Sequence, residues 1–548
     1  KNIRIYLGGK LSDLSDPHQM KDMDRLVEIL AQKIRKQVHI RIIGDYDVDG
    51  VTSSHLFLTA LRRVGAKVDV VIPHRIQDGY GLSLHLLQQA KEDGVDTILT
   101  CDNGIAAIDE IAWAKAQKMT VLVTDHHAVP FEEHEGRRTE KKSLADAVVN
   151  PHQQDCGYPY KELCGAGVAW NVIRVLYENY DMDKREAEDL LDFVAMATVC
   201  DVMSLTGENR ILVKEGLKRI RHTKNIGLQA LMQACNVQPE NISAYHFGYV
   251  LGPCVNATGR LDTARHALRL FETGQETEAE EIARDLVDLN QERKELTLQG
   301  VEMAKKLCEE GGYENDPVLV LFLPDVHESI AGLIAGRIRE MYNRPVFVLT
   351  RGEEGVKGSG RSTENYSMYE NMCGCAELFT KFGGHPMAAG LSLPEENVEK
   401  FRRKINENCP LTVEEVCPDI HIDMAMPVGY ASTELVHQFA LLEPFGKDNP
   451  SPLFADRNLS ISRMWLIGKN RNVLRMSVLS EYGQPVPVIF FGDVETLFAY
   501  FTEKFGQEEV ENALHGRKNR ILFSMVYTAK IDFYQGNENL QLEMKYYR

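Results

Sequence analysis

The chain has 548 residues, of which 44% are hydrophobic and 26% charged, and its formal net charge at pH 7 is −18. This length favours about three to four domains of roughly 150 residues each, and no apolar run approaches the roughly 18 residues that a membrane span needs. The acidic balance excludes a protein coated with nucleic acid over its whole surface, although it leaves room for a locally basic groove.

The first residue is Lys1 rather than Met, and no secretory signal follows it. We therefore expect a cytoplasmic protein that has lost or been trimmed of an N-terminal piece. The 11 cysteines are scattered singly apart from Cys373 and Cys375, and no two CxxC units have the spacing of a structural zinc site. This pattern indicates reduced thiols rather than a disulfide framework.

From residue 38, short β-rich runs alternate with helical stretches: "VHIRIIG", "TSSHLFLTALRRVG", "VDVVIPH", "LSLHLLQQAKEDG", "TILT", "IDEIAWAKAQK" and "TVLVT". Such alternation is typical of βαβ units around a parallel sheet that helices cover on both faces. We therefore predict an α/β fold for the first 200 residues. Ligands of open parallel sheets bind beyond the carboxyl ends of the strands, so we expect functional side chains directly after the predicted strands.

Acidic and imidazole side chains follow three of the predicted strands. Asp45, Asp47 and Asp49 come after "IRIIG", and Asp102 comes after "TILT" and a cysteine. The run at 125–127, which contains His126 and His127, follows "TVLVT". A solvated turn would also explain the aspartates, since Asp and Gly are common in loops, but the shared sheet edge favours a joint site.

A further acid, Asp201, lies in the mostly apolar helical stretch "DFVAMATVCDVMSL". Burying an aspartate there is costly unless it is paired or coordinated, and the alternative is an exposed residue at the helix terminus. We favour coordination, because the ligands at the strand ends need a partner from elsewhere.

Carboxylates with a single imidazole suit Mn²⁺ or Mg²⁺ better than structural zinc, and there are enough of them to hold two ions. Two ions about 3.5–4 Å apart activate water and neutralise charge during phosphoester hydrolysis. We expect Asp102 and Asp201 to bridge them. The predicted metal ligands are Asp45, Asp47, Asp49, Asp102, His126 and Asp201.

Residues 276–310 are highly charged and have apolar side chains at intervals of three and four, which predicts one long, largely exposed helix between two lobes, with a cleft between them. A second, smaller α/β unit follows. Beyond residue 415, alternating runs predict a small antiparallel barrel, interrupted by helical periodicity near 493–513. We expect four segments: 1–225, 226–310, 311–410 and 411–548.

Two glycine-rich stretches of the second unit, "VKGSGRST" and "KFGGHPMAAGLSL", fit an anion site, because glycines let backbone N–H groups approach phosphate. The candidate donors are Ser359, Arg361, Ser362 and His385. In "GPCVNATGR", Arg260 is a candidate to hold phosphate and Asn256 to orient it. Taken alone, "GSGRS" is more often a loop, and a helix-capping turn would also explain "GPCVNATGR".

The ordered set "DYDVDG", "CDNG", "TDHH", "ATVCDVMSL", "GPCVNATGRL", "GSGRS" and "FGGHPMAAGLS" closely resembles the DHH phosphoesterase superfamily, and within it the bacterial single-strand-specific exonucleases. The resemblance extends over nearly the whole chain, and "LLEPFGKDNPSPLF" is similar to the entry to their OB-fold domain. It implies a two-metal 5′-to-3′ exonuclease that threads single-stranded DNA between the DHH lobe and the DHH-associated lobe and releases mononucleotides in DNA repair and recombination.

By this resemblance, the six aspartate and histidine ligands bind the metals, and His127 lies at the metal site or the scissile phosphate, with Asp102 and Asp201 as its catalytic partners. The substrate phosphates would be bound by Arg260, Ser359, Arg361, Ser362 and His385, and the partners would include a helicase and a single-strand-binding protein. Three positions depart from the pattern: Val48 stands where alanine is usual, Cys254 where an arginine is frequent, and Ile43 where smaller relatives have a histidine ligand.

Two other functions stay open. A phosphodiesterase for short oligonucleotides or cyclic dinucleotides would use the same chemistry but would generally lack the third domain. A non-catalytic replication factor would have degraded metal motifs, which are intact here. In the predicted barrel, Arg463, Trp465, Lys469, Arg471 and Arg475 are candidates for a DNA-guiding groove, although we expect Trp465 to belong to the core.

Overall fold

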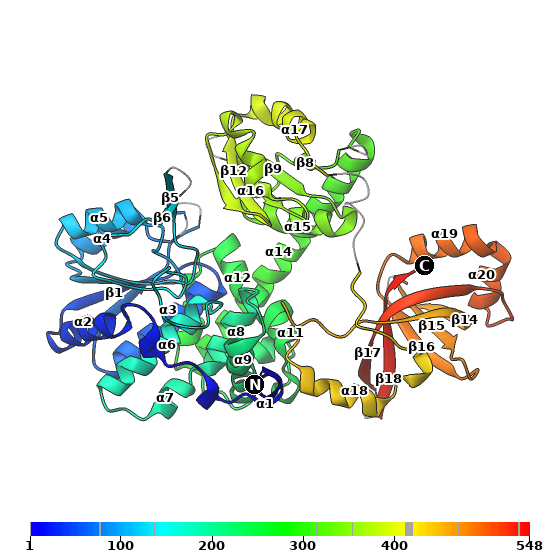
Figure 1. Ribbon diagram of the computed structural model, residues 1–548, viewed down its shortest axis with the longest axis horizontal. Helices are drawn as coiled ribbons and strands as arrows, with labels where there is room; N and C mark the ends of the chain where they lie inside the picture. Colours follow the sequence, from blue (N-terminus) through cyan, green and yellow to red (C-terminus); the bar gives the residue numbers. More distant parts are fainter. Residues whose placement is uncertain are drawn as a thin grey trace. The chain divides into compact units, whose positions relative to one another are not determined.

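The computed structural model (Figure 1) describes residues 2–75, 78–79, 81–134, 137–313, 316–352, 355–411, 420–468, 471–534 and 537–548. It divides into two compact units. The larger unit comprises Lys10–Met203 and Gly207–Pro418, and the smaller comprises Lys1–Gly9, Ser204–Thr206 and Asp419–Arg548. Among the helices that could be searched, none combines the length and the apolar character that crossing a membrane requires.

A parallel five-stranded sheet with the order β2-β1-β3-β4-β7 forms the first lobe of the larger unit. Its strands are β1 (His39–Ile43), β2 (Lys67–Val71), β3 (Thr97–Cys101), β4 (Thr120–Thr124) and β7 (Ala147–Val149). One face packs on α4 (Leu84–Glu92) and α5 (Ile108–Ala116). The helices α2 (Met23–Arg35), α3 (Val48–Arg63) and α6 (Gly165–Asn179) cover the other (Figure 1). The predicted α/β fold is confirmed.

A series of helices follows the parallel sheet in the chain. They are α7 (Lys184–Glu188), α8 (Leu191–Cys200), α9 (Gly207–Ile220), α10 (Ile226–Ala234), α11 (Ala244–His246), a π-helical turn (Phe247–Leu251), α12 (Gly252–Leu261), α13 (Arg265–Glu272) and α14 (Glu276–Glu310). The predicted long connecting helix is α14, with 35 residues. Its apolar stripe, including Ile282 and Leu286, is buried, and its charged faces are mostly exposed.

The second lobe contains a sheet with the order β11-β12-β10-β9-β8. Its strands are β8 (Leu319–Phe322), β9 (Val346–Gly352), β10 (Gly355–Arg361), β11 (Lys381–His385) and β12 (Ala388–Leu393), and its helices are α15 (Ala331–Tyr342), α16 (Met368–Cys373) and α17 (Val398–Glu407). Both glycine-rich stretches therefore lie largely in strands rather than in loops. A Cβ at Gly358 would lie 2.4 Å from Leu349 Cδ2, which explains why β10 carries glycine there.

The smaller unit contains the predicted barrel, which the pairing of β14 with β17 closes. Its strands are β13 (Met424–Ala425), β14 (Phe454–Ile467), β15 (Val473–Leu479), β16 (Pro485–Phe490), β17 (Leu522–Tyr534) and β18 (Asn537–Tyr547). Its helices are α1 (Asn2–Gly8), α18 (Thr433–Phe439), α19 (Val494–Phe505) and α20 (Gln507–Leu514). The ladders of the closed barrel are antiparallel, as expected, except that β16 and β18 are parallel.

Trp465 differs from its expected place in the barrel core. Met464 is fully buried there, whereas its neighbour Trp465 is only half-buried, because successive residues of a strand face opposite sides. The exposed Arg463 guanidinium lies 5.6 Å from the Trp465 ring centroid. The candidate groove residue Lys469 lies outside the described residues.

Close helix packing fixes α8, the helix that ends at Asp201. At Gly216 in α9, a Cβ would lie 2.3 Å from both Ala195 Cβ and the Leu191 carbonyl oxygen of α8. The α8 and α9 backbones can therefore approach only because residue 216 has no side chain.

We expect Gly216→Ala to lower the free energy of unfolding by about 1–3 kcal/mol, because the added methyl group forces the two helices apart. The control is Gly336→Ala in α15, where an added Cβ meets nothing within 4 Å. There we expect a gain of about 0.5–1 kcal/mol from helix propensity. Urea unfolding followed by circular dichroism measures both values, and equal effects would contradict the packing explanation.

Candidate metal centre and anion site

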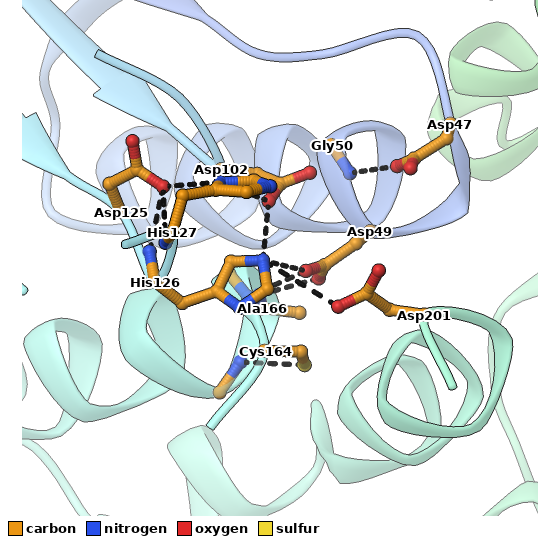
Figure 2. Close-up of polar contacts among 12 residues, drawn as sticks. Asp47, Asp49, Gly50, Asp102, Asp125, His126, His127, Cys164, Ala166 and Asp201 are labelled. Atoms are coloured by element: carbon orange, nitrogen blue, oxygen red, sulfur yellow. Dashed lines mark hydrogen bonds and ion pairs between the residues drawn. The ribbon is translucent and has the colours of Figure 1, made fainter. Parts of the chain in front are cut away.

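The side chains that follow β1, β3 and β4 converge at one edge of the parallel sheet, and Asp201 reaches them from the C-terminal end of α8 (Figure 2). His126 lies at the middle of this group. Its Nε2 is 3.1 Å from Asp102 Oδ1, 3.5 Å from Asp201 Oδ2 and 3.6 Å from Asp49 Oδ2. The structure thus brings together groups that are far apart in the sequence.

Helix N-termini hold two of the aspartates. Asp47 caps α3, and its Oδ1 accepts a hydrogen bond from the Gly50 N–H at 3.1 Å. Asp49, in the first turn of α3, accepts bonds from the N–H groups of Gly165 at 2.6 Å and Ala166 at 2.7 Å. These two amides begin α6, so the positive end of that helix dipole stabilises the Asp49 carboxylate and fixes its direction.

Asp102 occupies a tightly enclosed position just beyond β3. Its backbone is left-handed, with φ at 60°, a conformation that Asp and Asn adopt more readily than most residues. A Cβ at Gly165 would lie 2.6 Å from Asp102 Cβ, so the start of α6 can approach it only with glycine at this position. The turn directs the carboxylate toward His126.

Three groups of ligand atoms lie close enough to hold cations. They are Asp45, Asp47 and Asp102; Asp49, His126 and Asp201; and Asp102, His126 and His127, with the ligand atoms of each group within 4.8 Å of one another. Asp102 and His126 each belong to two groups, whereas Asp201 belongs to one. All six predicted ligands therefore lie in clusters with the composition of a site for hard divalent cations.

The pKa values and unpartnered atoms of this cluster indicate that it lacks positive charge. Burial, together with the neighbouring carboxylates, raises the pKa of both Asp45 and Asp102 well above the usual range. Asp45 Oδ1 and His126 Nε2 are buried, and neither has a hydrogen-bond partner among the described residues. Because divalent cations would neutralise the carboxylates and occupy these ligand atoms, the residues present fit a metal centre.

Asp125 was noted in the sequence but not assigned a role. Its Oδ1 accepts hydrogen bonds from the His126 N–H at 2.7 Å, the His127 N–H at 3.0 Å and His127 Nδ1 at 2.7 Å, while Oδ2 accepts from the Ile105 N–H at 2.9 Å. Burial by itself lowers the pKa of His127. The hydrogen bond to Asp125 and the charges of nearby carboxylates outweigh this effect and raise the pKa to about 9. Asp125 thus positions both histidines, a role that a carboxylate beside two histidines could have suggested.

Three other arginines lie close enough to Arg260 to affect it electrostatically. Burial and the nearby charges of Arg75, Arg293 and Arg361 lower the pKa of Arg260 to about 10, and burial together with Arg75 lowers that of Arg361. Arg260 Nη1 donates to the Ser329 carbonyl oxygen at 2.7 Å. Crowded cations of this kind favour an anionic ligand, and sequence reasoning missed Arg75.

A cavity of about 410 Å³ in the larger unit is lined by residues of both lobes. Tyr46, between Asp45 and Asp47, lines it together with Arg75 from the first lobe, and Lys357, Ser359 and Lys381 from the second. Lys357, Ser359 and Arg361 alternate along β10 with glycines, so they share one face of that strand. A polyanion could thus meet basic and hydroxyl groups beside the candidate metal ligands.

Other predicted phosphate contacts are placed differently. Ser362 is 1% exposed and its Oγ donates to the Tyr366 carbonyl oxygen at 2.5 Å, while His385 is exposed at the end of β11 and does not line the cavity. Asn256 Oδ1 accepts from the Val48 N–H at 3.1 Å, so it supports the first turn of α3. That turn carries Asp49, which links α12 to the metal centre.

Three domain families match the chain in order: the DHH family, N-terminal domain, over residues 39–198; the DHHA1 domain over 315–409; and the RecJ OB domain over 422–546. The fold and the acidic site thus define a DHH-type phosphoesterase.

Similarity to individual proteins shows which family within this class the chain belongs to. Single-stranded-DNA-specific exonuclease RecJ of Haemophilus influenzae is 32% identical, with 98% of this chain and 92% of that protein aligned. RecJ of Bacillus subtilis is 33% identical over 88% of this chain, which spans only 60% of that relative's length. The crystal structure of RecJ in complex with Mn²⁺ from Thermus thermophilus matches with a TM-score of 0.78 at 25% identity, covering 100% of this chain and 75% of that one. The chain belongs to the RecJ family.

Without metal, mutual repulsion in the cluster should cost stability. We expect Asp102→Asn to raise the free energy of unfolding in EDTA by on the order of 1–2 kcal/mol, because the amide removes one charge and tolerates the left-handed backbone. With Mn²⁺ at 100 times its dissociation constant, the wild type should gain about 2.7 kcal/mol and the variant less.

Thermal unfolding with and without Mn²⁺ measures these changes. The control is Asp288→Asn, at an exposed carboxylate on α14, which should alter neither value. Lower stability of Asp102→Asn in EDTA, with an unchanged response to Mn²⁺, would contradict the role of Asp102 in the cluster.

Proposed function

We propose that this protein is a metal-dependent exonuclease that degrades single-stranded DNA from the 5′ end to mononucleotides. One observation carries the proposal: carboxylates and a histidine from three strand ends and α8 converge on shared ligand positions, next to a cavity that basic groups line. The printed names of the RecJ relatives support single-stranded DNA as substrate. The polarity and the product rest on the family resemblance.

The proposed cofactors are two Mn²⁺ or Mg²⁺ ions, and RecJ from T. thermophilus has been crystallised with each of these metals. We assign their binding to Asp45, Asp47, Asp49, Asp102, His126 and Asp201, which supply the hard oxygen ligands and the one imidazole that such ions accept. When bound, these ions would activate a water molecule and neutralise charge on the phosphate.

The chain's own groups then position the substrate. With its pKa near 9, His127 is protonated at neutral pH and can donate a proton or a hydrogen bond to a phosphate oxygen, while Asp125 fixes its ring. Arg260 and Arg361 would neutralise the phosphates that enter the site, with Arg75 beside them. Ser359 would add a hydroxyl donor from β10.

The barrel would guide the strand. The barrel lies within the part of the chain that matches the RecJ OB domain. Its Arg463 offers a cation, and its half-buried Trp465 offers a ring on which a base can stack. We further propose a helicase and a single-strand-binding protein as partners, because an enzyme restricted to single strands needs another protein to open the duplex.

The first experiment uses purified protein, Mn²⁺ and single-stranded DNA labelled at either end. We expect immediate release of the 5′ label as a mononucleotide and gradual shortening of strands that carry the 3′ label, with blunt duplex resistant. EDTA and His126→Ala should abolish the reaction, whereas His85→Ala, at an exposed histidine, should not. Asp125→Asn should lower the rate by about 10–100-fold.

Hydrolysis of dinucleotides but not of polymers would contradict the exonuclease assignment and indicate a phosphodiesterase for small substrates. Binding without hydrolysis of any substrate would favour a non-catalytic role. Full activity of correctly folded His126→Ala would remove His126 from the reaction.

Substitution of Arg361 should weaken substrate binding without changing metal binding. We expect Arg361→Ala to raise KM for single-stranded DNA by about 10-fold or more, since a charge-assisted phosphate contact contributes about 1.5–3 kcal/mol. Metal affinity, measured by Mn²⁺ titration, should stay unchanged. The matched control is Arg351→Ala on β9, where the exposed arginine pairs with Glu395. An equal KM change in both variants would exclude a specific contact.

A further inference from the structure

A continuous helical segment extends over residues 244–261 and consists of α11, the π-helical turn and α12. Its C-terminal half belongs to the sites described above, because Asn256 supports the first turn of α3 and Arg260 is a candidate phosphate contact. Its N-terminal half contributes none of the candidate metal ligands and does not line the anion cavity. Turns of π-helix are rare and occur frequently at functional sites, so this half calls for an explanation.

Two tyrosines of the N-terminal half present their rings to solvent. Tyr245 is 62% exposed and Tyr249 is 71% exposed. Their rings stack on each other, with centroids 5.1 Å apart and an angle of 23° between the ring planes. They meet because residues four apart lie on the same side of a helix. Stacking covers one face of each ring, and the large exposed fractions show that much of the remaining ring surface is open.

The π-helical turn packs on the end of α8, directly before Asp201. Cys200 Sγ donates to the Phe247 carbonyl oxygen at 3.3 Å. A Cβ at Gly252 would lie 2.3 Å from the same sulfur, so the two segments can approach this closely only because residue 252 is glycine. The turn that carries Tyr249 is therefore held beside the strand-end cluster through the helix that supplies Asp201.

Tyr249 also lies on the same side of the helical segment as the groups that serve the known sites. Seven residues, which is close to two helical turns, separate Tyr249 from Asn256, and a further four lead to Arg260. Seven residues span about 10 Å of helix, which corresponds to about three nucleotides of a stacked strand at about 3.4 Å each. A strand with its 5′ end at the metal centre could thus bring roughly its third to sixth bases to the tyrosines.

An open aromatic surface in this position fits a nucleic-acid base. Every base has a ring face that can stack on an aromatic side chain, so such a contact accepts any sequence. Bases within a duplex are already stacked on one another and cannot offer these faces, whereas single strands can. The arginines and Ser359 supply contacts to phosphate, so a stacking surface would add a contact of a different kind.

We propose that the stacked pair Tyr245 and Tyr249 binds bases of single-stranded DNA a few nucleotides from the 5′ end. This inference rests on the proposed exonuclease function and assigns it a base contact, in addition to the phosphate contacts of the anion site. Because a duplex cannot use the pair, the two tyrosines contribute to the preference for single strands.

The test compares two single strands of about 12 nucleotides, a length within the range that single-strand-binding sites cover. One strand carries every base, and in the other abasic sugars replace roughly the third to sixth nucleotides. Both keep all phosphates, so their contacts with the arginines are equal. KM for release of a 5′ label is measured with Mn²⁺, and binding of the same strands is measured by fluorescence anisotropy with Ca²⁺.

For the wild type, we expect the abasic strand to have a KM about 10-fold higher and to bind correspondingly more weakly. Tyr249→Ala should raise KM for the complete strand, and the double variant Tyr245→Ala, Tyr249→Ala should raise it by about 10-fold and no longer distinguish the two strands. Tyr249→Phe, which keeps the ring, should behave as the wild type. Both side chains are exposed, so these variants should fold.

Two further variants serve as controls. Tyr482→Ala removes a tyrosine that is 72% exposed, between β15 and β16 of the smaller unit, and should leave KM for both strands unchanged. Arg361→Ala should raise KM for both strands by the same factor and keep the difference between them, because it removes a phosphate contact rather than a base contact.

A wild type that does not distinguish the two strands would overturn the proposal, and so would a double variant that still distinguishes them fully. Cleavage that does not depend on the tyrosines would leave the exonuclease function intact and exclude only the stacking site. Tyrosine-dependent binding with Ca²⁺, without cleavage with Mn²⁺, would support the stacking site and contradict the exonuclease function alone.

Discussion

The mutual repulsion of carboxylates at one edge of the parallel sheet is the constraint on which the rest of the structure depends. Five aspartates and two histidines meet there in three groups whose ligand atoms lie within 4.8 Å of one another, and burial raises the pKa of Asp45, Asp47 and Asp102. The chain offsets part of this cost with the N-terminus of α6 at Asp49. Divalent cations would offset the remainder, which makes metal binding part of the stability of this lobe as well as of its chemistry.

The surrounding packing gives the cluster its geometry. Gly165 lets α6 approach Asp102, and Gly216 lets α9 approach α8, which ends at Asp201. Asn256 ties α12 to the first turn of α3, and Arg260, on the same helix, reaches Ser329 of the second lobe. Helix α12 thus connects the metal ligands to the phosphate-binding groups. A substrate that shifts Arg260 would therefore also shift the contact of Asn256 with the first turn of α3.

Much of this arrangement could be predicted because it depends on local pattern and topology. The βαβ alternation and the rule that ligands gather at strand ends predict from the sequence that Asp45, Asp102 and His126 lie together. The position of Ser362 could not be obtained in the same way, because its burial against Tyr366 depends on packing between distant segments. The same holds for Arg75, whose place beside Arg260 is set by the meeting of two lobes. Trp465 was expected in the core, but strand alternation gives that face to Met464.

The central claim is that the clustered carboxylates are tolerated because they hold two cations. Anomalous diffraction at the manganese absorption edge from crystals grown with Mn²⁺ tests it most directly. We expect two peaks, one among Asp49, His126 and Asp201 and the other among Asp45, Asp47 and Asp102. No peak at the sheet edge, or manganese bound only at other carboxylates of the surface, would contradict the account.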